Sequence, residues 1–237
     1  MNNTAVCWLW KGLSLSRREF LPEHVNILHR MMKRHGFEGR LVCITNESSI
    51  EFDKDIVVMP TPPEAEALGV LPSPEGGRFP SSYRRLWMFS DEARCLGDNL
   101  LLLDIDMVIL KDITPLFDFA EDFIGWLPRR SWGKERRIAG GIYLLKPGTR
   151  PGVWEDFKGA PSIAEAHRAG YRGSDQAWIS YKLAQDAMIF PRDSGIYSIR
   201  DLKGLVPKLP ADARLVQFNG PVKPWQSDLP WVKENWK

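Results

Sequence analysis

The chain has 237 residues, 43% of them hydrophobic, which suits one sizeable α/β domain and argues against disorder. A formal net charge of +2 argues against a protein that coats nucleic acid by charge alone, although it allows a local basic patch. No run approaches the roughly 20 apolar residues of a membrane span, and we expect no signal peptide. Three widely spaced cysteines, Cys7, Cys43 and Cys95, indicate no disulfide framework, so we expect a reducing, cytoplasmic compartment.

The first part of the chain alternates short apolar runs with an amphipathic segment. The apolar runs predict three strands, at 5–10, 40–45 and 55–59. Apolar residues at helical spacing predict a helix over 22–35, which begins at Pro22 and stops at Gly36. This alternation of strand and helix is typical of an α/β protein with a largely parallel sheet, whose ligands bind beyond the carboxyl ends of the strands.

The middle of the chain is dominated by one apolar run. A segment rich in Pro and Gly over 61–80 predicts a long loop, and the apolar face of 82–96 predicts a helix. The most apolar run follows at 99–110 and predicts a buried strand.

The second half of the chain has a more mixed pattern. It predicts a short helix or turn at 116–119 and a loop over 128–137. Further strands are expected at 122–127, 138–145 and 215–218, with Gly140 and Gly141 interrupting the second of them. Further helices are expected at 152–158, 162–169 and 176–184.

Two aspartates interrupt the apolar run LLLDIDMVIL, residues 101–110. Because side chains alternate along a strand, the spacing of Asp104 and Asp106 puts both carboxylates on one face. Adjacent carboxylates repel each other unless positive charge lies between them, and Mg²⁺ or Mn²⁺ would supply that charge while leaving positions for phosphate oxygens. The alternative is a pair of aspartates facing water at a strand end, which an apolar setting disfavours.

Two later segments carry weaker signals. In Gly173-Ser174-Asp175-Gln176 the aspartate could cap a helix, or the acid and amide could grip sugar hydroxyls. In LVQFNGPVKPW, residues 215–225, Gly220 allows close backbone approach and Lys223 offers a point charge for a phosphate. Alone, this second segment is a Gly/Pro turn with a lysine.

Taken in order, four segments resemble glycosyltransferase family 8 and its bacterial and phage-encoded relatives with the GT-A fold. They are LLLDIDMVIL, AGGIYLL, GSDQAWIS and VQFNGPVKPW, and Tyr83-Arg84-Arg85-Leu86 resembles the basic segment that precedes the aspartates in that family. The resemblance spans nearly the whole chain. It implies one GT-A (Rossmann-like) α/β domain over 1–237, with a mixed, mainly parallel central sheet flanked by helices. About 1–110 would form the nucleotide-binding half and about 111–237 the acceptor and sugar half.

The resemblance also implies metal-dependent transfer of a sugar from a nucleotide-diphosphate sugar, with a UDP-sugar favoured and the anomeric configuration retained. Asp104 and Asp106 would hold Mn²⁺ or Mg²⁺, and Asp175 and Gln176 would lie beside the donor sugar as catalytic residues. The residues implied to bind the nucleotide sugar are Trp10, Lys11, Arg84, Arg85, Asp104 and Lys223, with Gly140 and Gly141 on the sugar side.

One departure concerns the metal. The family usually provides a histidine ligand from the last loop, and none of the four histidines of this chain lies there. Depending on the alignment, Gln217 or Asn219 takes that position, and an amide oxygen is a weaker but tolerable ligand. The departure implies low metal affinity, a shell completed by water, or a non-catalytic relative that binds nucleotide sugars.

The segment WLPRRSWGKERR, residues 126–137, is strongly basic. It is either a solvated surface loop or the binding surface for an anionic acceptor, such as a modified base in DNA, a phosphorylated glycan or a lipid headgroup. The acceptor residues on the second interpretation are Arg129, Arg130, Trp132, Arg136 and Arg137.

A different enzyme class, the metal-dependent nucleotidyltransferases, would share the paired aspartates. Such enzymes normally need a phosphate-cradling Gly-rich loop, and the sequence contains no GxxxxGK[ST] motif. We therefore keep nucleotidyl transfer as an alternative and favour glycosyl transfer.

Overall fold

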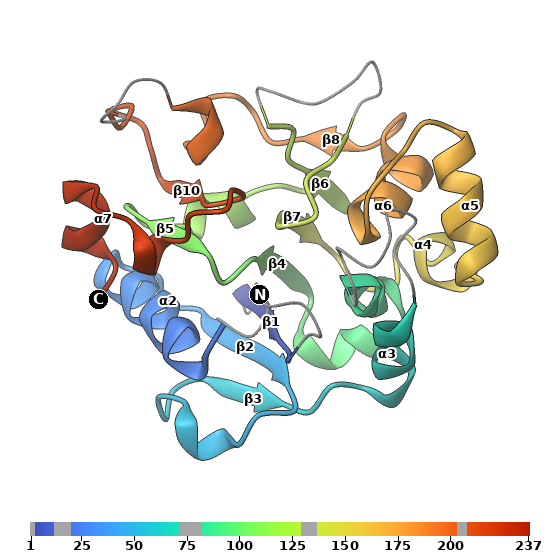
Figure 1. Ribbon diagram of the computed structural model, residues 1–237, viewed down its shortest axis with the longest axis horizontal. Coiled ribbons are helices and arrows are strands. Elements are labelled where there is room, and N and C mark those ends of the chain that lie inside the picture. The colour runs from blue at the N-terminus through green and yellow to red at the C-terminus, as the bar shows by residue number, and fades with distance from the viewer. Residues whose placement is uncertain (1–2, 12–19, 72–81, 129–136, 203–207) are drawn as a thin grey trace.

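The computed structural model describes residues 3–11, 20–71, 82–128, 137–202 and 208–237. The strands of its central sheet are β1 (Asn3–Leu9), β2 (Arg40–Thr45), β3 (Val57–Met59), β4 (Asn99–Leu103), β6 (Phe123–Gly125), β7 (Ile142–Leu145) and β8 (Met188–Ile189). They form a seven-stranded sheet in the order β3-β2-β1-β4-β7-β6-β8 (Figure 1). Since β7 is antiparallel to both neighbours and the other pairings are parallel, the sheet is mixed and mainly parallel, which confirms the predicted fold class.

A small second sheet lies beside the first. Its strands are β5 (Met107–Ile109), β9 (Ile196–Ser198) and β10 (Leu215–Gln217), in the order β5-β10-β9. The helices are α2 (Pro22–Arg34), α3 (Pro63–Ala67), α4 (Gly152–Glu155), α5 (Ala160–Arg168), α6 (Asp175–Leu183) and α7 (Pro230–Asn235). Shorter 3₁₀ helices occupy Ser49–Glu51, Leu68–Val70, Ser82–Phe89, Glu92–Leu96, Thr114–Phe117, Ile199–Asp201 and Pro224–Gln226.

The central strands are mostly apolar because both faces of the sheet are covered. In β4, Leu101 and Leu103 pack on the face that carries α2, α7 and the small sheet. Leu100 and Leu102 pack on the opposite face, beneath the 3₁₀ helix Ser82–Phe89 and helices α4, α5 and α6. Figure 1 shows α2 and α7 on one side of the sheet and α4, α5 and α6 on the other. A strand buried on both faces gives a continuous hydrophobic run rather than an alternating one.

The predicted strand over 99–110 is wrong in one respect. The run forms two strands, β4 and β5, which belong to different sheets, and the chain bends between them at Asp104-Ile105-Asp106. The aspartates therefore follow the carboxyl end of an apolar strand, as their place in the motif indicated, but the extended strand does not continue through them. Side-chain partners from distant segments hold both carboxylates in this bend, and local apolar periodicity carries no signal of such partners.

Two other predictions need correction. The segment 82–96 forms two 3₁₀ helices rather than one α-helix, and all eight residues of Ser82–Phe89 are buried, so tertiary packing overrides local helix preference. The segment 61–80 is not a continuous loop, because it contains α3, whose Pro63 occupies the first turn where proline is tolerated. Strands β8 and β9 and helix α7 were not predicted, and each is six residues or shorter.

Other elements lie close to their predicted positions. The strand over 40–45 has the predicted bounds, and the helix predicted over 22–35 spans Pro22–Arg34. Gly36 follows this helix with φ of 92°, the left-handed conformation that glycine adopts most readily. In the described ranges, no helix combines the length and the apolar character that crossing a bilayer requires.

An aromatic cluster ties the C-terminal segment to α2. The Trp225 indole stacks on the His24 imidazole, with ring centroids 3.9 Å apart and planes 9° apart. Phe20 and Trp236 pack against the same indole at 5.1 and 5.9 Å. The cluster fixes the 3₁₀ helix Pro224–Gln226 against the body of the protein. It also desolvates the imidazole, and this burial lowers the pKa of His24 below the ordinary value of 6.5 against the opposing charge of Glu23.

We predict that stability falls as the pH falls below about 6.5, because the unfolded chain then binds more protons than the folded one. Replacing His24 with Phe keeps an aromatic ring in the stack and removes the titrating group, so the slope of unfolding free energy against pH should become smaller. Urea denaturation between about pH 7.5 and 5.5 measures both slopes. Equal slopes for the two proteins would contradict the prediction.

Candidate functional site

Polar side chains from distant segments gather at the carboxyl edge of the central sheet. The bend 104–106 follows the carboxyl end of β4, and Gly140 and Gly141 precede β7, which is antiparallel and starts at the same edge. Asp175 begins α6, and Lys223 follows β10. In mainly parallel sheets this edge is where ligands bind, as the sequence analysis anticipated.

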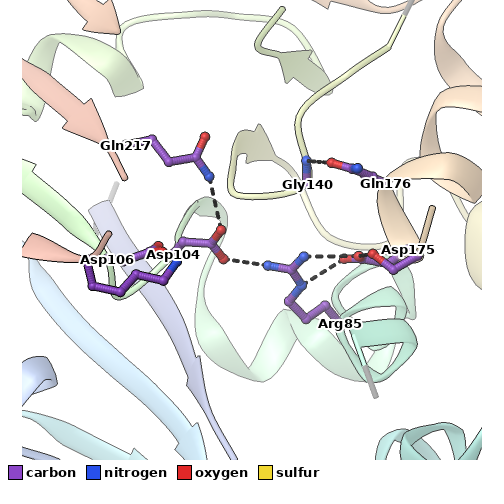
Figure 2. Close-up of polar contacts among 9 residues, drawn as sticks. Arg85, Asp104, Asp106, Gly140, Asp175, Gln176 and Gln217 are labelled. Carbon is purple, nitrogen blue, oxygen red and sulfur yellow. Dashed lines mark hydrogen bonds and ion pairs between the residues drawn. The ribbon is translucent and has the colours of Figure 1, made fainter. Parts of the chain in front are cut away.

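The centre of the site is the buried guanidinium of Arg85, from the 3₁₀ helix Ser82–Phe89. Its Nη1 donates to Asp104 Oδ1 at 2.6 Å, while Nε and Nη2 donate to the two carboxylate oxygens of Asp175 at 2.7 and 3.0 Å. Figure 2 shows the three side chains in one line, with Arg85 between the two carboxylates. Only 7% of the arginine side chain is exposed and none of the Asp175 side chain, so this is a desolvated charge network.

The electrostatics of Arg85 reflect two opposing effects. Burial alone would lower the pKa of the guanidinium, but the charges of Asp175 and Asp104 outweigh it and leave the pKa above its ordinary value. The arginine is therefore a fixed positive charge at any accessible pH. The cost of burying it is offset by bidentate hydrogen bonds to Asp175 and a further bond to Asp104.

Asp175 and Gln176 occupy different environments although they are neighbours. Asp175 does not cap α6: helix α6 has no side-chain cap, and the carboxylate instead accepts from Arg85 and from the hydroxyl of Ser174. Gln176 is exposed, and its Oε1 lies 3.5 Å from the backbone nitrogen of Gly140 (Figure 2). Gln176 is thus the member of the pair that can contact a ligand directly.

The second aspartate of the bend is held by a lysine. Lys223 Nζ forms a short ion pair with Asp106 Oδ2, and it also donates to the carbonyl of Phe218 at 3.2 Å. The exposed fractions of the Lys223 and Asp106 side chains are 15% and 7%. The stacking of Trp225, two residues further on, positions this lysine.

The two amides proposed as metal ligands lie differently. Gln217 Nε2 donates to Asp104 Oδ2 at 3.0 Å (Figure 2), and its buried Oε1 has no hydrogen-bond partner among the described residues. Asn219 Oδ1 instead accepts from Ser198 Oγ at 2.7 Å. The geometry therefore favours Gln217 over Asn219 as the amide beside the paired carboxylates.

This donor set fits a hard divalent cation. Among the residues that the structure describes, no group of three His, Cys, Asp or Glu side chains comes together as a ready metal cage. Asp104 and Asp106 offer carboxylate oxygens, which Mg²⁺ and Mn²⁺ accept. Gln217 turns its amide nitrogen toward Asp104, so its oxygen would join them only after rotation of the amide (Figure 2). The remaining positions would go to water or phosphate.

Of the other residues predicted to bind nucleotide sugar, Trp10 and Lys11 follow the carboxyl end of β1, and Arg84 belongs to the 3₁₀ helix Ser82–Phe89. The guanidinium carbon of Arg84 lies 5.1 Å from the ring centroid of Trp10, and Arg84 also pairs with Glu66 at 3.6 Å. Lys11 Nζ lies 3.0 Å from Glu47 Oε2. Arg84 therefore faces Trp10, whereas Arg85 faces the aspartates, so the structure separates these two arginines into different environments.

The glycines before β7 allow the close packing of this site. A Cβ on Gly141 would lie 1.9 Å from Gln217 Nε2 and 2.3 Å from Asp104 Oδ2, and a Cβ on Gly140 would approach Gln176 and Arg85 to 3.0 and 3.1 Å. The Gly141 carbonyl also accepts from the Asp104 amide at 2.8 Å. At Gly220 an added Cβ would meet nothing within 4 Å, so the close approach expected there is not seen among the described residues.

The acceptor residues predicted from the basic segment fall mostly outside the described ranges. Arg129, Arg130, Trp132 and Arg136 lie within 129–136, which the structure does not describe. Arg137 is described, and its Nη2 donates to the carbonyl of Gly170 at 3.1 Å. The C-terminal end of this segment therefore contacts the turn between α5 and α6.

Sequence reasoning did not single out Tyr143 of β7. This side chain is fully buried, its hydroxyl has no hydrogen-bond partner within the part of the chain that the structure describes, and burial raises the pKa of the phenol. The charges of Arg85, Asp175 and Asp104 also act on it, which places it next to the charge network. Its one sequence signal was its position in AGGIYLL, and an aromatic residue in an apolar strand normally indicates core packing.

Replacing Gly141 with Ala should displace Gln217 and Asp104 from each other, because the new methyl group would overlap both side chains. We expect a loss of about 1–3 kcal/mol in unfolding free energy, typical of overpacking. Gly220→Ala is the matched control, with a change within about 0.5 kcal/mol. Urea denaturation measures both, and equal stability of the two variants would contradict the packing described for Gly141.

Comparison with known proteins identifies the fold. No protein-family profile matches the sequence, and neither does any curated protein. The galactosyltransferase LgtC, solved with donor and acceptor sugar analogues, superposes with a TM-score of 0.68 at 14% identity, covering 98% of this chain and 93% of LgtC. Another LgtC structure is an active-site mutant in which a glutamine is replaced by glutamate.

Two further structures agree. The glycosyltransferase GlyE of Streptococcus pneumoniae TIGR4 has a TM-score of 0.61 at 12% identity, over 99% of this chain and 60% of GlyE. Mouse xyloside xylosyltransferase 1 has a TM-score of 0.59 at 13% identity, over 92% of this chain and 98% of the mouse protein. At such low identity the similarity establishes the architecture, and this architecture is the GT-A fold of glycosyltransferases.

Proposed function

We propose that this protein is a glycosyltransferase, related to family 8, that moves a sugar from a nucleotide-diphosphate sugar to an anionic acceptor with the help of Mn²⁺ or Mg²⁺. The observation that carries the proposal is the pair Asp104 and Asp106 at the carboxyl edge of a GT-A sheet, flanked by Lys223 and Arg85. Paired carboxylates with nearby cations suit a diphosphate and its metal.

In this proposal the residues around the diphosphate have separate roles. Asp104, Asp106 and Gln217 would hold the divalent cation, whose charge stabilises the departing nucleoside diphosphate. Lys223 would pair with a phosphate oxygen as a point charge. Arg85 would keep Asp104 in place, because the bidentate pairing with Asp175 fixes the guanidinium from behind.

On the sugar side, the structure supports different roles for the two predicted catalytic residues. Asp175 has no exposed side-chain surface and binds Arg85 through both oxygens, so we assign it to positioning the arginine. Gln176 is exposed beside Gly140, and we assign it to contact with the donor sugar. An active-site glutamine in LgtC, the one replaced in its mutant structure, supports this choice. Retention of anomeric configuration is the outcome we expect.

The nucleotide would lie over the carboxyl ends of β1 and β2, within the half formed by about 1–110, with its base near Trp10 and Lys11. UDP is the nucleotide we favour. The part from about 111 to 237 would then provide the sugar and acceptor surfaces and, through Gln217 and Lys223, reach back to the aspartates.

Products of donor hydrolysis test the proposal. Incubation of UDP-sugars with Mn²⁺ should release free sugar and UDP, whereas release of sugar 1-phosphate and UMP would indicate a nucleotidyltransferase, and binding without products a non-catalytic nucleotide-sugar-binding protein. Asp106→Asn should lower metal-dependent turnover by at least about 100-fold, which corresponds to about 2.7 kcal/mol of transition-state stabilisation. Unchanged turnover in this variant at matched Mn²⁺ would count against the whole scheme.

The anionic acceptor has its own test. Substituting Arg129, Arg130, Arg136 and Arg137 together with Ala should weaken transfer to nucleic acid or phosphorylated glycan while donor hydrolysis stays unchanged, because none of these residues is assigned to donor binding in this proposal. Steady-state kinetics with varied acceptor give the comparison. Acceptor kinetics identical to the wild type would show that the basic segment is only a solvated surface.

A further inference from the structure

We propose that Lys223 couples the binding of the divalent cation to the binding of the diphosphate. In the ligand-free protein its ammonium group neutralises Asp106, and it leaves this carboxylate to a cation only when a diphosphate offers it a new partner. The inference rests on the proposed function. It adds that the cation and the nucleotide each bind weakly alone and more tightly when the other is bound.

The first observation is the desolvation of the ion pair. Lys223 Nζ contacts Asp106 directly, and the side chains of the two residues are 15% and 7% exposed. The ammonium also contacts the carbonyl of Phe218 and lies 5.5 Å from the ring centroid of Phe20. A pair this shielded from water is much stronger than an exposed one, so a cation must displace a real competitor to reach Asp106.

The second observation is that Asp104 is also engaged. Arg85 and Gln217 each donate to one of its oxygens. The network of Asp104, Asp106 and Asp175 with Arg85 and Lys223 has three carboxylates against two cations, a net charge of only one negative. With no third acidic or histidine ligand in the described part of the chain, a divalent cation entering alone would find little attraction.

The two protein cations differ in what they would lose. Arg85 keeps its bidentate partner Asp175 if a metal takes over Asp104. Lys223, if separated from Asp106, would retain among the described residues the Phe218 carbonyl and the ring of Phe20. A partly buried ammonium without a counter-charge is costly, and a phosphate oxygen removes that cost. We therefore assign to Lys223, rather than to Arg85, the effect of the diphosphate on the affinity of the site for the cation.

Linkage makes the effect reciprocal. A diphosphate that draws Lys223 away raises the affinity of the site for the cation, and the cation raises the affinity for the diphosphate by the same factor. Couplings of this kind typically amount to about 5–150-fold.

Titration with Mn²⁺, followed by its electron paramagnetic resonance signal, tests the proposal without any turnover. Binding is measured with and without UDP, and with inorganic pyrophosphate as a second probe. The wild type should bind Mn²⁺ weakly alone and about 5–150-fold more tightly with either probe. Lys223→Met should bind Mn²⁺ alone more tightly than the wild type, because the competitor is gone. The enhancement by the probes should be smaller than in the wild type, because only direct contact between phosphate and Mn²⁺ remains to produce it.

Two further variants serve as controls. Lys223→Arg keeps the positive charge and should keep the weak binding of Mn²⁺ alone. Lys233→Met removes another lysine of the C-terminal segment, whose ion pair with Asp228 is exposed, and should leave both affinities unchanged. Thermal denaturation reports folding, and Lys223→Gln replaces the Met variant if that variant does not fold.

The possible outcomes distinguish a failure of the inference about Lys223 from a failure of the proposed function. Lys223→Met or Lys223→Gln binding Mn²⁺ alone no more tightly than the wild type overturns the inference, as does an enhancement by the probes that is as large in these variants as in the wild type. If the inference is overturned in this way but the wild-type protein releases UDP from donor sugars, the proposed function still stands. Tighter Mn²⁺ binding and loss of enhancement by pyrophosphate, in a protein that hydrolyses no nucleotide sugar, would support the inference and contradict the proposed function.

Discussion

A buried guanidinium holds the site together. Arg85 lies between Asp104 and Asp175 with almost no access to water, so removing either carboxylate would leave a desolvated charge without full compensation. The bend after β4, the start of α6 and the 3₁₀ helix Ser82–Phe89 are thereby fixed to one another by a single side chain. Within this arrangement Gly141 approaches Asp104 closely, and Gln176, the neighbour of the buried Asp175, is exposed.

Charge balance explains why carboxylates can gather at this edge of the sheet. Asp104, Asp106 and Asp175 would repel one another in isolation, and two protein cations, Arg85 and Lys223, compensate most of their charge. The compensation is uneven, since the arginine has a partner on each side while the lysine has one carboxylate. Lys223 could therefore exchange its carboxylate for a ligand while the ion pairs of Arg85 remain in place.

Local patterns predicted the long elements and the place of the aspartates. Helix α2 and strand β2 have strong periodicity and clear ends, so they were predicted closely. The break of the 99–110 run into β4 and β5, and the 3₁₀ character of Ser82–Phe89, depend on contacts with distant segments that periodicity does not record. For the same reason the sequence indicated that Asp175 and Lys223 belong near the aspartates, but not that Asp175 would be fully buried behind Arg85 or that Lys223 would pair with Asp106.

The separation of the partners along the chain affects how the protein is made. Gln217 follows Asp104 by 113 residues, and Lys223 follows Asp106 by 117. At about 5–20 residues per second, the ribosome adds the lysine roughly 6–23 s after its aspartate. Strand β5 likewise cannot pair in the small sheet until β10, its partner strand, has been synthesised. During that interval Asp104 already has Arg85 available, but Asp106 lacks the counter-charge of Lys223. The site is therefore completed late in folding, after the apolar centre of the sheet has had time to collapse.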